Sequence, residues 1–323
     1  MRIYVLRLAS AMAVLLGLLL SSCKSDSATS TTPAASSAQT AAGMSQEQVT
    51  FAMQDEAMKA LIAAAQAEDS SALNRILGPE RSELMSGDKV EDANDLKRFA
   101  TSAADQAHLE NKGDATAVLY VGPRDWPFPI PLVKNSQGRW YWDTQAGKRI
   151  ILERRIGRNE LEAIKVCRTY VQAQREYASA DRDGSDVLKY AQRFVSHPGK
   201  HDGLFWEAGA GEEESPLGPL VAQASAEGYK EKHAPFHGYY YHILTRQGPD
   251  APGGSYDYVI NGNMVGGHAL VAWPDRYGVS GVMTFMVNQR GKVYEKDLGP
   301  DTDRIARGMT EFNPDSSWRV VKE

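Results

Sequence analysis

The clearest periodic pattern in the chain is ELEAIKVCRTYVQAQREYA, which occupies residues 160–178. Its apolar side chains recur at the spacing of one face of a helix, and they are Leu161, Ile164, Cys167, Val171 and Ala178. The pattern predicts a long amphipathic helix. Asn159 precedes it where an N-cap residue is expected, and Gly157 is expected to interrupt the helical sequence of residues 145–156.

Strand patterns dominate the sequence after this helix. GYYYHILT at residues 238–245 is rich in aromatic and β-branched residues, and Asn261-Gly262 between two short apolar runs is a strong hairpin signal. Further strands are predicted at residues 268–273, 282–287 and 292–296, before a short helix at 301–309. Residues 158–323 are therefore predicted to form a domain in which a long helix packs on an antiparallel β-meander.

The sequence before the helix predicts another α+β domain, at residues 45–157. Helical patterns come first, at residues 53–67, 70–77 and 91–104, and strand patterns follow at 115–121, 130–134 and 139–142. This order, with a last strand of the Gly-Arg-Trp-x-Trp-Asp type, resembles the nuclear transport factor two-like cone. The resemblance implies a pocket, so one alternative function is a small-ligand carrier that uses Trp140 and Trp142.

The composition excludes several classes of protein. Hydrophobic residues make up 42% and charged residues 24% of the 323 residues, which argues against a disordered chain and against a multi-span membrane protein. The formal charge of −5 gives no reason to expect a nucleic-acid partner. Two cysteines exclude a dense disulfide framework and a zinc ribbon.

Residues 1–22 have the pattern of a secretory signal peptide. Arg2 and Arg7 accompany the apolar run of residues 8–20, which is too short to cross ~30 Å of hydrocarbon comfortably. The run ends in Leu20-Ser21-Ser22-Cys23, which resembles the lipobox of bacterial lipoproteins. The resemblance implies cleavage before Cys23 and a membrane anchor on this residue, made of a diacylglyceryl group and acyl chains such as palmitate.

The residues after the lipobox predict where the protein lies. Lys24 stands where many lipoproteins of the inner membrane carry Asp, so an outer-membrane lipoprotein that faces the periplasm is expected. Residues 23–44 contain KSDSATSTTPAASSAQTAAG, which has no large apolar side chain. Such a sequence cannot bury enough apolar surface to order itself, and it predicts a flexible tether.

Most of the remaining sequence resembles a bacterial lipoprotein family known as domain of unknown function 2950. Five stretches carry the resemblance: VGP with WPFPIP at residues 121–131, IGRNE at 156–160, SPLGPL at 215–220, FHGYY at 236–240 and YGVSGVMTF at 277–285. The family implies no established activity and no catalytic residues.

Residues from 159 onward also resemble the globular part of type IV pilin-like and pseudopilin proteins. NELEAI at residues 159–164, ALVAWP at 269–274 and GVSG at 278–281 carry this second resemblance. Pilins polymerise through an apolar N-terminal half of their helix, whereas the helix expected here is internal and amphipathic. A pilin-like sheet is therefore expected without the function of a pilus subunit.

The acidic sequence at residues 181–186, DRDGSD, is the candidate metal site. Its carboxylates Asp181, Asp183 and Asp186 offer oxygen ligands of the kind that Ca²⁺ prefers, so calcium is the possible cofactor of this site. Gln192 stands where an EF-hand loop has its bidentate Glu, so the alternative is an Asp-rich turn that ends the helix.

Residues of catalytic type do not form a convincing set. His197 and His201, and then His233, His237 and His242, have spacings that suit zinc, but prolines interrupt both groups. Ser280 lacks the strand-to-helix elbow of a nucleophilic serine, and the place of Cys167 on the apolar face predicts an inert, buried thiol. WPFPIP at residues 126–131 predicts a rigid connector whose Trp126 and Phe128 pack inward, or alternatively an exposed contact surface.

The sequence as a whole favours a tethered, non-catalytic envelope protein that binds a protein partner or supports assembly. A periplasmic hydrolase or metal-dependent enzyme is the alternative, based on His237, His242 and His268 in neighbouring predicted strands.

Overall fold

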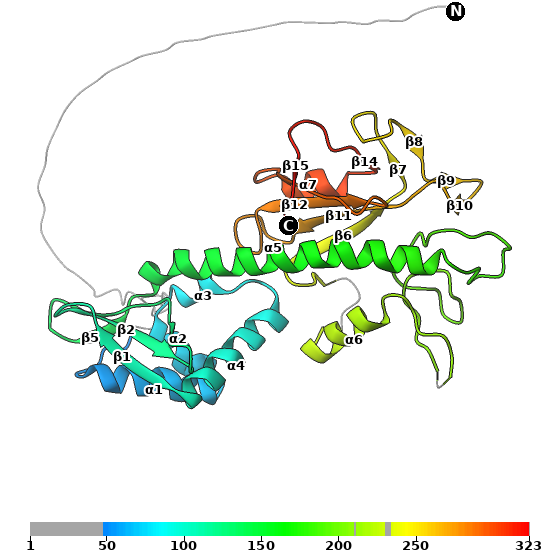
Figure 1. The fold of residues 1–323 in the computed structure, drawn as a ribbon. Helices are drawn as coiled ribbons and strands as arrows, with labels where there is room; N and C mark the ends of the chain where they lie inside the picture. Colours follow the sequence, from blue (N-terminus) through cyan, green and yellow to red (C-terminus); the bar gives the residue numbers. More distant parts are fainter. Residues whose placement is uncertain (1–47, 210, 230–233, 323) are drawn as a thin grey trace, which may run out of the picture. The chain divides into compact units, whose positions relative to one another are not determined.

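The computed structural model describes residues 48–209, 211–229 and 234–322 (Figure 1). Cys23 and the predicted signal peptide and tether lie outside the described residues. Helices and mostly antiparallel sheets make up the described residues, which confirms the α+β class. None of the described helices is both long enough and apolar enough to span a membrane.

The longest element is helix α5 (Thr144–Tyr177), and it runs without interruption through Gly157. The expectation that Gly157 breaks the helix is wrong. A glycine inside a helix costs only ~1 kcal/mol relative to alanine, and tertiary contacts on both sides of Gly157 outweigh this cost. Asp143 caps the helix by accepting a hydrogen bond from the Ala146 N–H at 3.0 Å. Asn159 is buried inside the helix, so its expected role as an N-cap is also wrong.

Four helices precede the first sheet, and they are α1 (Gln54–Gln66), α2 (Ser70–Leu77), α3 (Arg81–Leu84) and α4 (Lys89–Asp105). The three longer helices confirm the three helical patterns of the sequence. Asp69 and Asp88 are the N-caps of α2 and α4, and each side chain accepts two hydrogen bonds from backbone N–H groups of the first turn.

The first sheet is antiparallel and has the strand order β1-β2-β4-β5, with β3 (Trp126–Pro127) paired to β2. Its other strands are β1 (Ala107–Asn111), β2 (Thr116–Val121), β4 (Leu132–Lys134) and β5 (Trp140–Trp142). The sequence predicts β2, β4 and β5. It does not predict β1, whose sequence AHLEN places only two apolar residues, Ala107 and Leu109, on its half-buried face, which is a weak strand signal.

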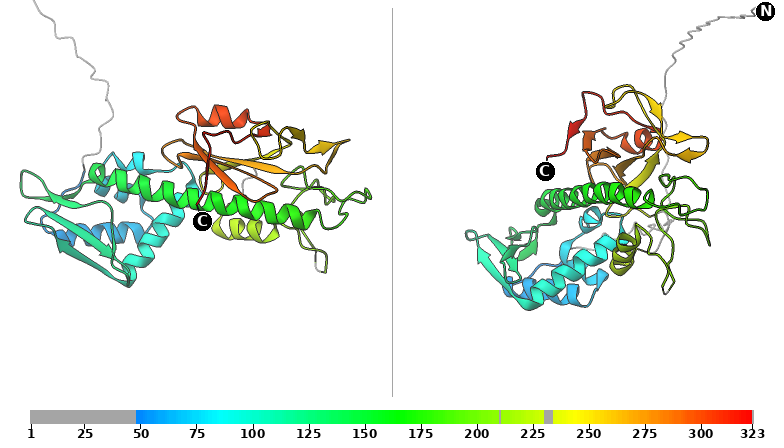
Figure 2. Two further views of the ribbon diagram at one scale, coloured as in Figure 1. Left: turned by 45° about the horizontal axis from the view of Figure 1, so that its top comes forward. Right: turned by 45° about the vertical axis from the view of Figure 1, so that its right-hand side comes forward.

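The second sheet is antiparallel and has the order β15-β13-β12-β11-β6. Its strands are β6 (Tyr239–Leu244), β11 (Ala269–Pro274), β12 (Met283–Asn288), β13 (Val293–Asp297) and β15 (Arg319–Val320). Helix α5 packs against β11 and β12, as Figure 2 shows from two directions. Every residue of β11 is buried because α7 (Thr302–Arg307) contacts the same strand as well.

Short elements complete the fold. A parallel pair joins β7 (Arg246–Gln247) to β14 (Glu311–Phe312), and β8 (Tyr256–Asp257) pairs with β7. The predicted hairpin around Asn261-Gly262 is present as β9 (Val259–Ile260) and β10 (Asn263–Met264). The prediction of a purely antiparallel meander was incomplete, and helix α6 (Gly218–Glu227) was not predicted.

Two hydrophobic cores hold these elements together. The first lies between α1, α2 and the first sheet and includes the fully buried Trp142. The second lies between the C-terminal half of α5 and the second sheet and includes Tyr170 and Phe285. The division of the chain into separately folding domains at residues 157 and 158 stays a prediction.

Candidate functional site

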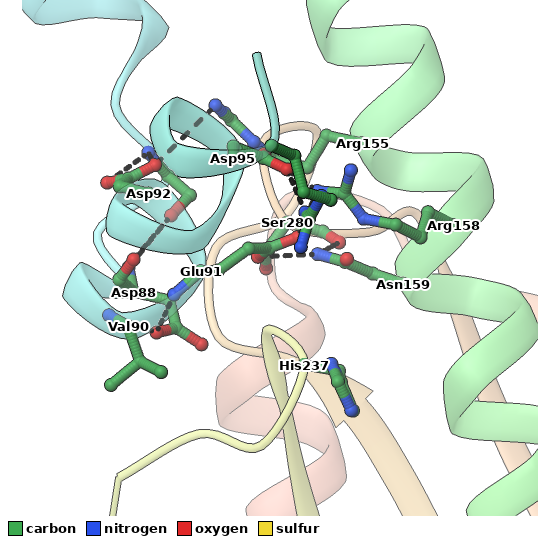
Figure 3. A network of polar contacts seen from close by, with 12 residues as sticks. Asp88, Val90, Glu91, Asp92, Asp95, Arg155, Arg158, Asn159, His237 and Ser280 are labelled. Atoms are coloured by element: carbon green, nitrogen blue, oxygen red, sulfur yellow. Dashed lines mark hydrogen bonds and ion pairs between the residues drawn. The ribbon is translucent and has the colours of Figure 1, made fainter. Parts of the chain in front are cut away.

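Three of the distinctive sequence stretches meet beside the middle of α5, and they are residues 156–160, 236–240 and 277–285. Helix α4 supplies carboxylates to the same place. Figure 3 shows Arg155, Arg158 and Asn159 of α5 beside the acidic side chains of α4. We call these residues, with Glu91, Asp92, Asp95 and Ser280, the polar cluster.

Glu91 is the most buried carboxylate of the cluster. It lies in the first turn of α4, where the Asp88 side chain accepts hydrogen bonds at 3.0 Å from the N–H groups of Val90 and Glu91. Asp88 also accepts a hydrogen bond from the Tyr229 hydroxyl at 2.8 Å. Burial, and then this carboxylate, raise the pKa of Tyr229, so the hydroxyl stays protonated and remains a donor.

Arg158 neutralises two of these carboxylates. Its guanidinium pairs with Glu91 and, at 2.9 Å, with Asp95. Burial works to lower the pKa of Arg158, but Asp95 and Glu91 together outweigh burial and raise this pKa. The ion pair therefore joins α4 to α5 through a group that stays charged.

Asn159 and Glu160 bind the turn that precedes β12. The Asn159 amide donates to the Ser280 carbonyl oxygen at 3.0 Å and to Glu91 at 3.3 Å. The Glu160 carboxylate accepts hydrogen bonds from the N–H groups of Val282 and Met283, both at 3.0 Å. Two neighbouring residues of α5 thus fix the position of one backbone segment that lies more than 100 residues further along the chain.

Gly238 shows how tightly this region packs. Its φ of +71° lies in the left-handed region, and a Cβ atom there would lie 2.7 Å from the Asn159 amide nitrogen and 2.9 Å from the Ser280 Cβ. Both the backbone conformation and the lack of space require glycine. This close approach explains why the FHGYY stretch has a glycine at position 238.

Arg155 is buried in the cluster with few partners. It donates to the Leu84 carbonyl oxygen and lies 3.8 Å from Asp92. Its Nε and Nη1 atoms have no hydrogen-bond partner among the described residues. Burial lowers the pKa of Arg155, and Asp92 and Glu91 oppose this effect only in part. Arg155 is therefore a buried cation whose charge is only partly compensated by its neighbours.

The cluster offers no nucleophile. The Ser280 hydroxyl is buried and occupied, since it accepts from the Arg276 N–H at 2.9 Å and donates to the Arg276 carbonyl at 3.2 Å. Cys167 is buried in the second core, and burial raises the pKa of its thiol to about 12. The side chains of the cluster instead connect α5 to α4 and to the turn before β12.

The acidic turn after α5 is satisfied by its own chain. Asp181 accepts hydrogen bonds from the N–H groups of Gly184, Ser185 and Asp186, the last at 2.7 Å. Asp183 pairs with Lys189 at 2.7 Å. These contacts are those of an Asp-rich turn, and calcium binding by Asp181, Asp183 and Asp186 stays a prediction.

The histidines lie apart and have different neighbours. His237 lies 3.3 Å from Glu227, His242 is exposed on β6, and His268 is buried between the rings of Tyr170 and Tyr190. His233 lies outside the described residues. Within the described ranges, no group of three or more His, Cys, Asp or Glu side chains is placed to hold a metal ion.

The aromatic side chains around the first sheet differ in exposure. Trp126 is exposed and lies against the Arg154 guanidinium, whereas Phe128 packs against Phe99 and Trp142. The inward-packing prediction is therefore right for Phe128 and wrong for Trp126, whose indole contacts Arg154 at the surface. Trp140 and Trp142 are buried within the first core, as part of its packing.

The sequence did not reveal the polar cluster as one site. In the sequence, Glu91 and Arg155 fall within the helical patterns of residues 91–104 and 145–156, and Asn159 stands where an N-cap is expected. IGRNE at residues 156–160 was the available signal, since it places a guanidinium, an amide and a carboxylate on consecutive positions.

The fold and the cluster define an α+β protein in which a long helix is clamped by buried polar contacts to an acidic helix and a strand turn. Residues 48–321 match the model of the family described as "Protein of unknown function (DUF2950)", and the chain belongs to this family. No curated protein matches the chain. No solved structure matches it either, so neither the cone-like nor the pilin-like resemblance is confirmed.

Proposed function

We propose that the protein is a lipid-anchored protein of the bacterial cell envelope that binds a protein partner. The lipobox-like sequence ending at Cys23 supports the anchor, and Lys24 supports the outer membrane, with the folded residues in the periplasm. An anchor with several acyl chains binds a membrane stably. The sequence of residues 24–43 supports a tether between this anchor and the folded residues.

The observation that carries the partner proposal is a group of exposed apolar side chains beside the β9-β10 hairpin. Ile260 is 51%, Val265 41% and Leu188 61% exposed. We call these three residues the hairpin patch. Ile260 ends β9 and pairs in register with Asn263, and Val265 follows β10 directly, so both side chains belong to the hairpin and its exit.

Leu188 belongs to the same region because its segment runs alongside β10. The Tyr190 N–H donates to the Met264 carbonyl oxygen at 2.8 Å, and the Lys189 amine donates to the Asn263 side chain at 2.9 Å. Single exposed apolar residues are common on protein surfaces, whereas a group of them supports an interaction site. Full burial of such a side chain contributes roughly 1.5–3 kcal/mol, so three form the centre of a modest interface.

The anchor is tested by membrane fractionation of cells that express the full chain. The unchanged protein is expected in the membrane fraction with acyl chains on Cys23, and Cys23→Ala is expected to leave it unmodified and released from the membrane. Retention of unmodified Cys23→Ala protein in the membrane would contradict the anchor, and it would leave the partner proposal untouched.

The partner is tested by cross-linking in intact envelopes, with a photoreactive residue at position 260. We expect one protein to be captured in near-stoichiometric amount, and we expect Val265→Asp to abolish the capture. Leu161→Asp is the matched control, because Leu161 is 69% exposed on α5 and lies outside the patch. Equal capture in the Val265→Asp and Leu161→Asp proteins would remove the hairpin patch from the proposal.

A further inference from the structure

Two adjoining cavities lie beyond the C-terminal end of α5, and the polar cluster and the hairpin patch make no use of them. Their volumes are about 410 Å³ and 220 Å³, and both are lined by Asp183 and Asp202. Small-molecule sites typically have volumes of roughly 300–1,000 Å³. The pair of cavities is therefore large enough for a small metabolite.

The walls of these cavities carry more positive than negative charge. Arg182, Lys189, Arg193 and Lys200 line them, against the two carboxylates Asp183 and Asp202. This excess of cations stands out in a chain whose formal charge is −5. A local positive potential in a concave site attracts anions.

Internal contacts leave two of the four cations available. Lys189 is paired with Asp183 at 2.7 Å, and Arg182 donates to Glu213 at 2.8 Å and to the last carbonyl oxygens of α5. Lys200 is exposed and forms no ion pair with the carboxylates of the described residues. Arg193 is likewise unpaired with a carboxylate within the described part of the chain.

The position of Arg193 is set by a chain of contacts. Asp202 lies 2.6 Å from the Nδ1 atom of His197, and the Arg193 guanidinium lies 2.7 Å from the Nε2 atom of the same ring. The same Arg193 nitrogen lies 3.2 Å from Nδ1, so it contacts both ring nitrogens while Asp202 contacts Nδ1. Asp202 and His197 therefore act as positioning residues for the guanidinium.

The loop that carries Lys200 is also held in place. The Lys200 N–H donates to the His197 carbonyl oxygen at 2.9 Å, and the Tyr177 hydroxyl donates to the His201 carbonyl oxygen at 2.7 Å. His201 stacks on Trp206, with ring centres 4.3 Å apart. The backbone of Lys200 and of His201 is thus held in place, which lowers the entropic cost of holding a ligand there.

We propose that these cavities bind a small polar anion that carries a phosphate or carboxylate group, with Lys200 and Arg193 as its charge partners. A guanidinium and an ammonium complement both groups, the first in a planar and the second in a compact geometry. The lining is mostly polar and includes Tyr177 and Tyr190, so the rest of the ligand is expected to carry hydroxyl groups, as a sugar ring does. This inference is independent of the protein partner proposed above.

The test is binding by the full chain purified in detergent, measured by calorimetry and by the midpoint of thermal unfolding. The probes are glucose 6-phosphate and glucuronate, with glucose and sodium chloride at equal ionic strength as controls. We expect one or both charged probes to bind and to raise the midpoint, whereas glucose and chloride leave it unchanged. Binding of only one probe identifies the anionic group, and binding of neither overturns the proposal.

Variants connect the binding to the two cations. Lys200→Ala and Arg193→Gln are each expected to weaken the dissociation constant at least tenfold. Lys292→Ala is the control, because Lys292 is exposed and lies outside the cavities. Lys200→Glu is expected to abolish binding without affecting folding, since its side chain is exposed. Equal affinities in the Lys200→Ala, Arg193→Gln and Lys292→Ala proteins would overturn the assignment.

Discussion

At the scale of single residues, the need for glycine at one position and the burial of one histidine depend on contacts between residues far apart in the sequence. Gly238 and Gly254 have similar φ values of +71° and +75°, yet only Gly238 is surrounded by side chains. His268 is fully buried, and neither ring nitrogen has a partner among the described residues. Each feature leads to a measurable effect on stability.

Gly238→Ala is expected to destabilise the protein by roughly 3 kcal/mol or more, because it adds a steric clash with Asn159 and Ser280 to the strain of a positive φ. Gly254→Ala is the matched control. A Cβ at Gly254 meets no described atom within 4 Å, so only the conformational cost of ~1 kcal/mol applies. Urea unfolding of both variants measures the difference, and equal losses would contradict the packing argument.

His268 is expected to make stability depend on pH. Burial, and then the nearby Arg175, lower its pKa from 6.5 to about 3 in the folded protein. Between pH 6.5 and about 3, His268 is therefore protonated in the unfolded chain but neutral in the folded protein. Stability is complete above pH 6.5 and falls progressively toward pH 3, with a loss of roughly 2–3 kcal/mol at pH 4.5.

His268→Phe removes this titration and is expected to flatten the stability profile between pH 6.5 and 4.5. Urea unfolding at several pH values measures the profile. His108→Gln is the control, since it also replaces a histidine, but one that is half-exposed on β1 of the first sheet. An unchanged slope in the His268→Phe protein would show that another group causes the pH dependence.

At the scale of elements, helix α5 links two structural regions because it is continuous. Two of its glycines differ in their surroundings. A Cβ at Gly157 would meet no described atom within 4 Å, whereas a Cβ at Gly147 would lie 2.7 Å from the Ile130 side chain. The same substitution should therefore have opposite effects at the two positions.

Gly157→Ala is expected to stabilise the protein by roughly 0.5–1 kcal/mol, since alanine loses less backbone entropy in a helix. Gly147→Ala is expected to destabilise it by roughly 1–3 kcal/mol, since the helix must move away from Ile130. Thermal and urea unfolding distinguish the two. A loss of stability in the Gly157→Ala protein would indicate that the helix bends or breaks at this position.

The contact between α4 and α5 depends on Glu91. Glu91→Gln removes one of the two carboxylates that pair with Arg158 and is expected to destabilise the protein by roughly 1–2 kcal/mol, because Arg158 is 40% exposed and keeps Asp95 as a partner. Glu162→Gln is the control, because Glu162 lies on α5 beside Lys165 at the surface. The double variant Glu91→Gln with Arg158→Met is expected to recover part of the loss. Additive losses in the double variant would mean that the two groups are not coupled.

At the scale of the whole molecule, the two hydrophobic cores are formed by residues from different parts of the chain. All buried members of the second core lie between Ala163 and Trp318. The fragment 158–323 therefore contains its complete core and is expected to fold cooperatively. Its Arg158 and Asn159 side chains would be hydrated in the absence of α4, so a modest loss of stability is expected.

Circular dichroism and urea unfolding of the 158–323 fragment test this prediction, with the full chain as reference. A single sharp transition supports a separately folding domain. A fragment that is soluble only with residues before Gly157 attached would show that the residues from 45 onward fold as one domain, with the polar cluster as part of its interior.

The sequence by itself determined the elements whose signals are local. Helices α1 and α2, strands β4 and β5, the β9-β10 hairpin and the burial of Cys167 follow from residue type and spacing, because each depends on neighbours within a few positions. The polar cluster and the cavities were decided only by tertiary structure. Asn159 binds Ser280, and Arg158 binds Glu91, across long separations in the chain, so the same residue that signals a cap locally becomes a buried contact once α4 and the turn before β12 surround it.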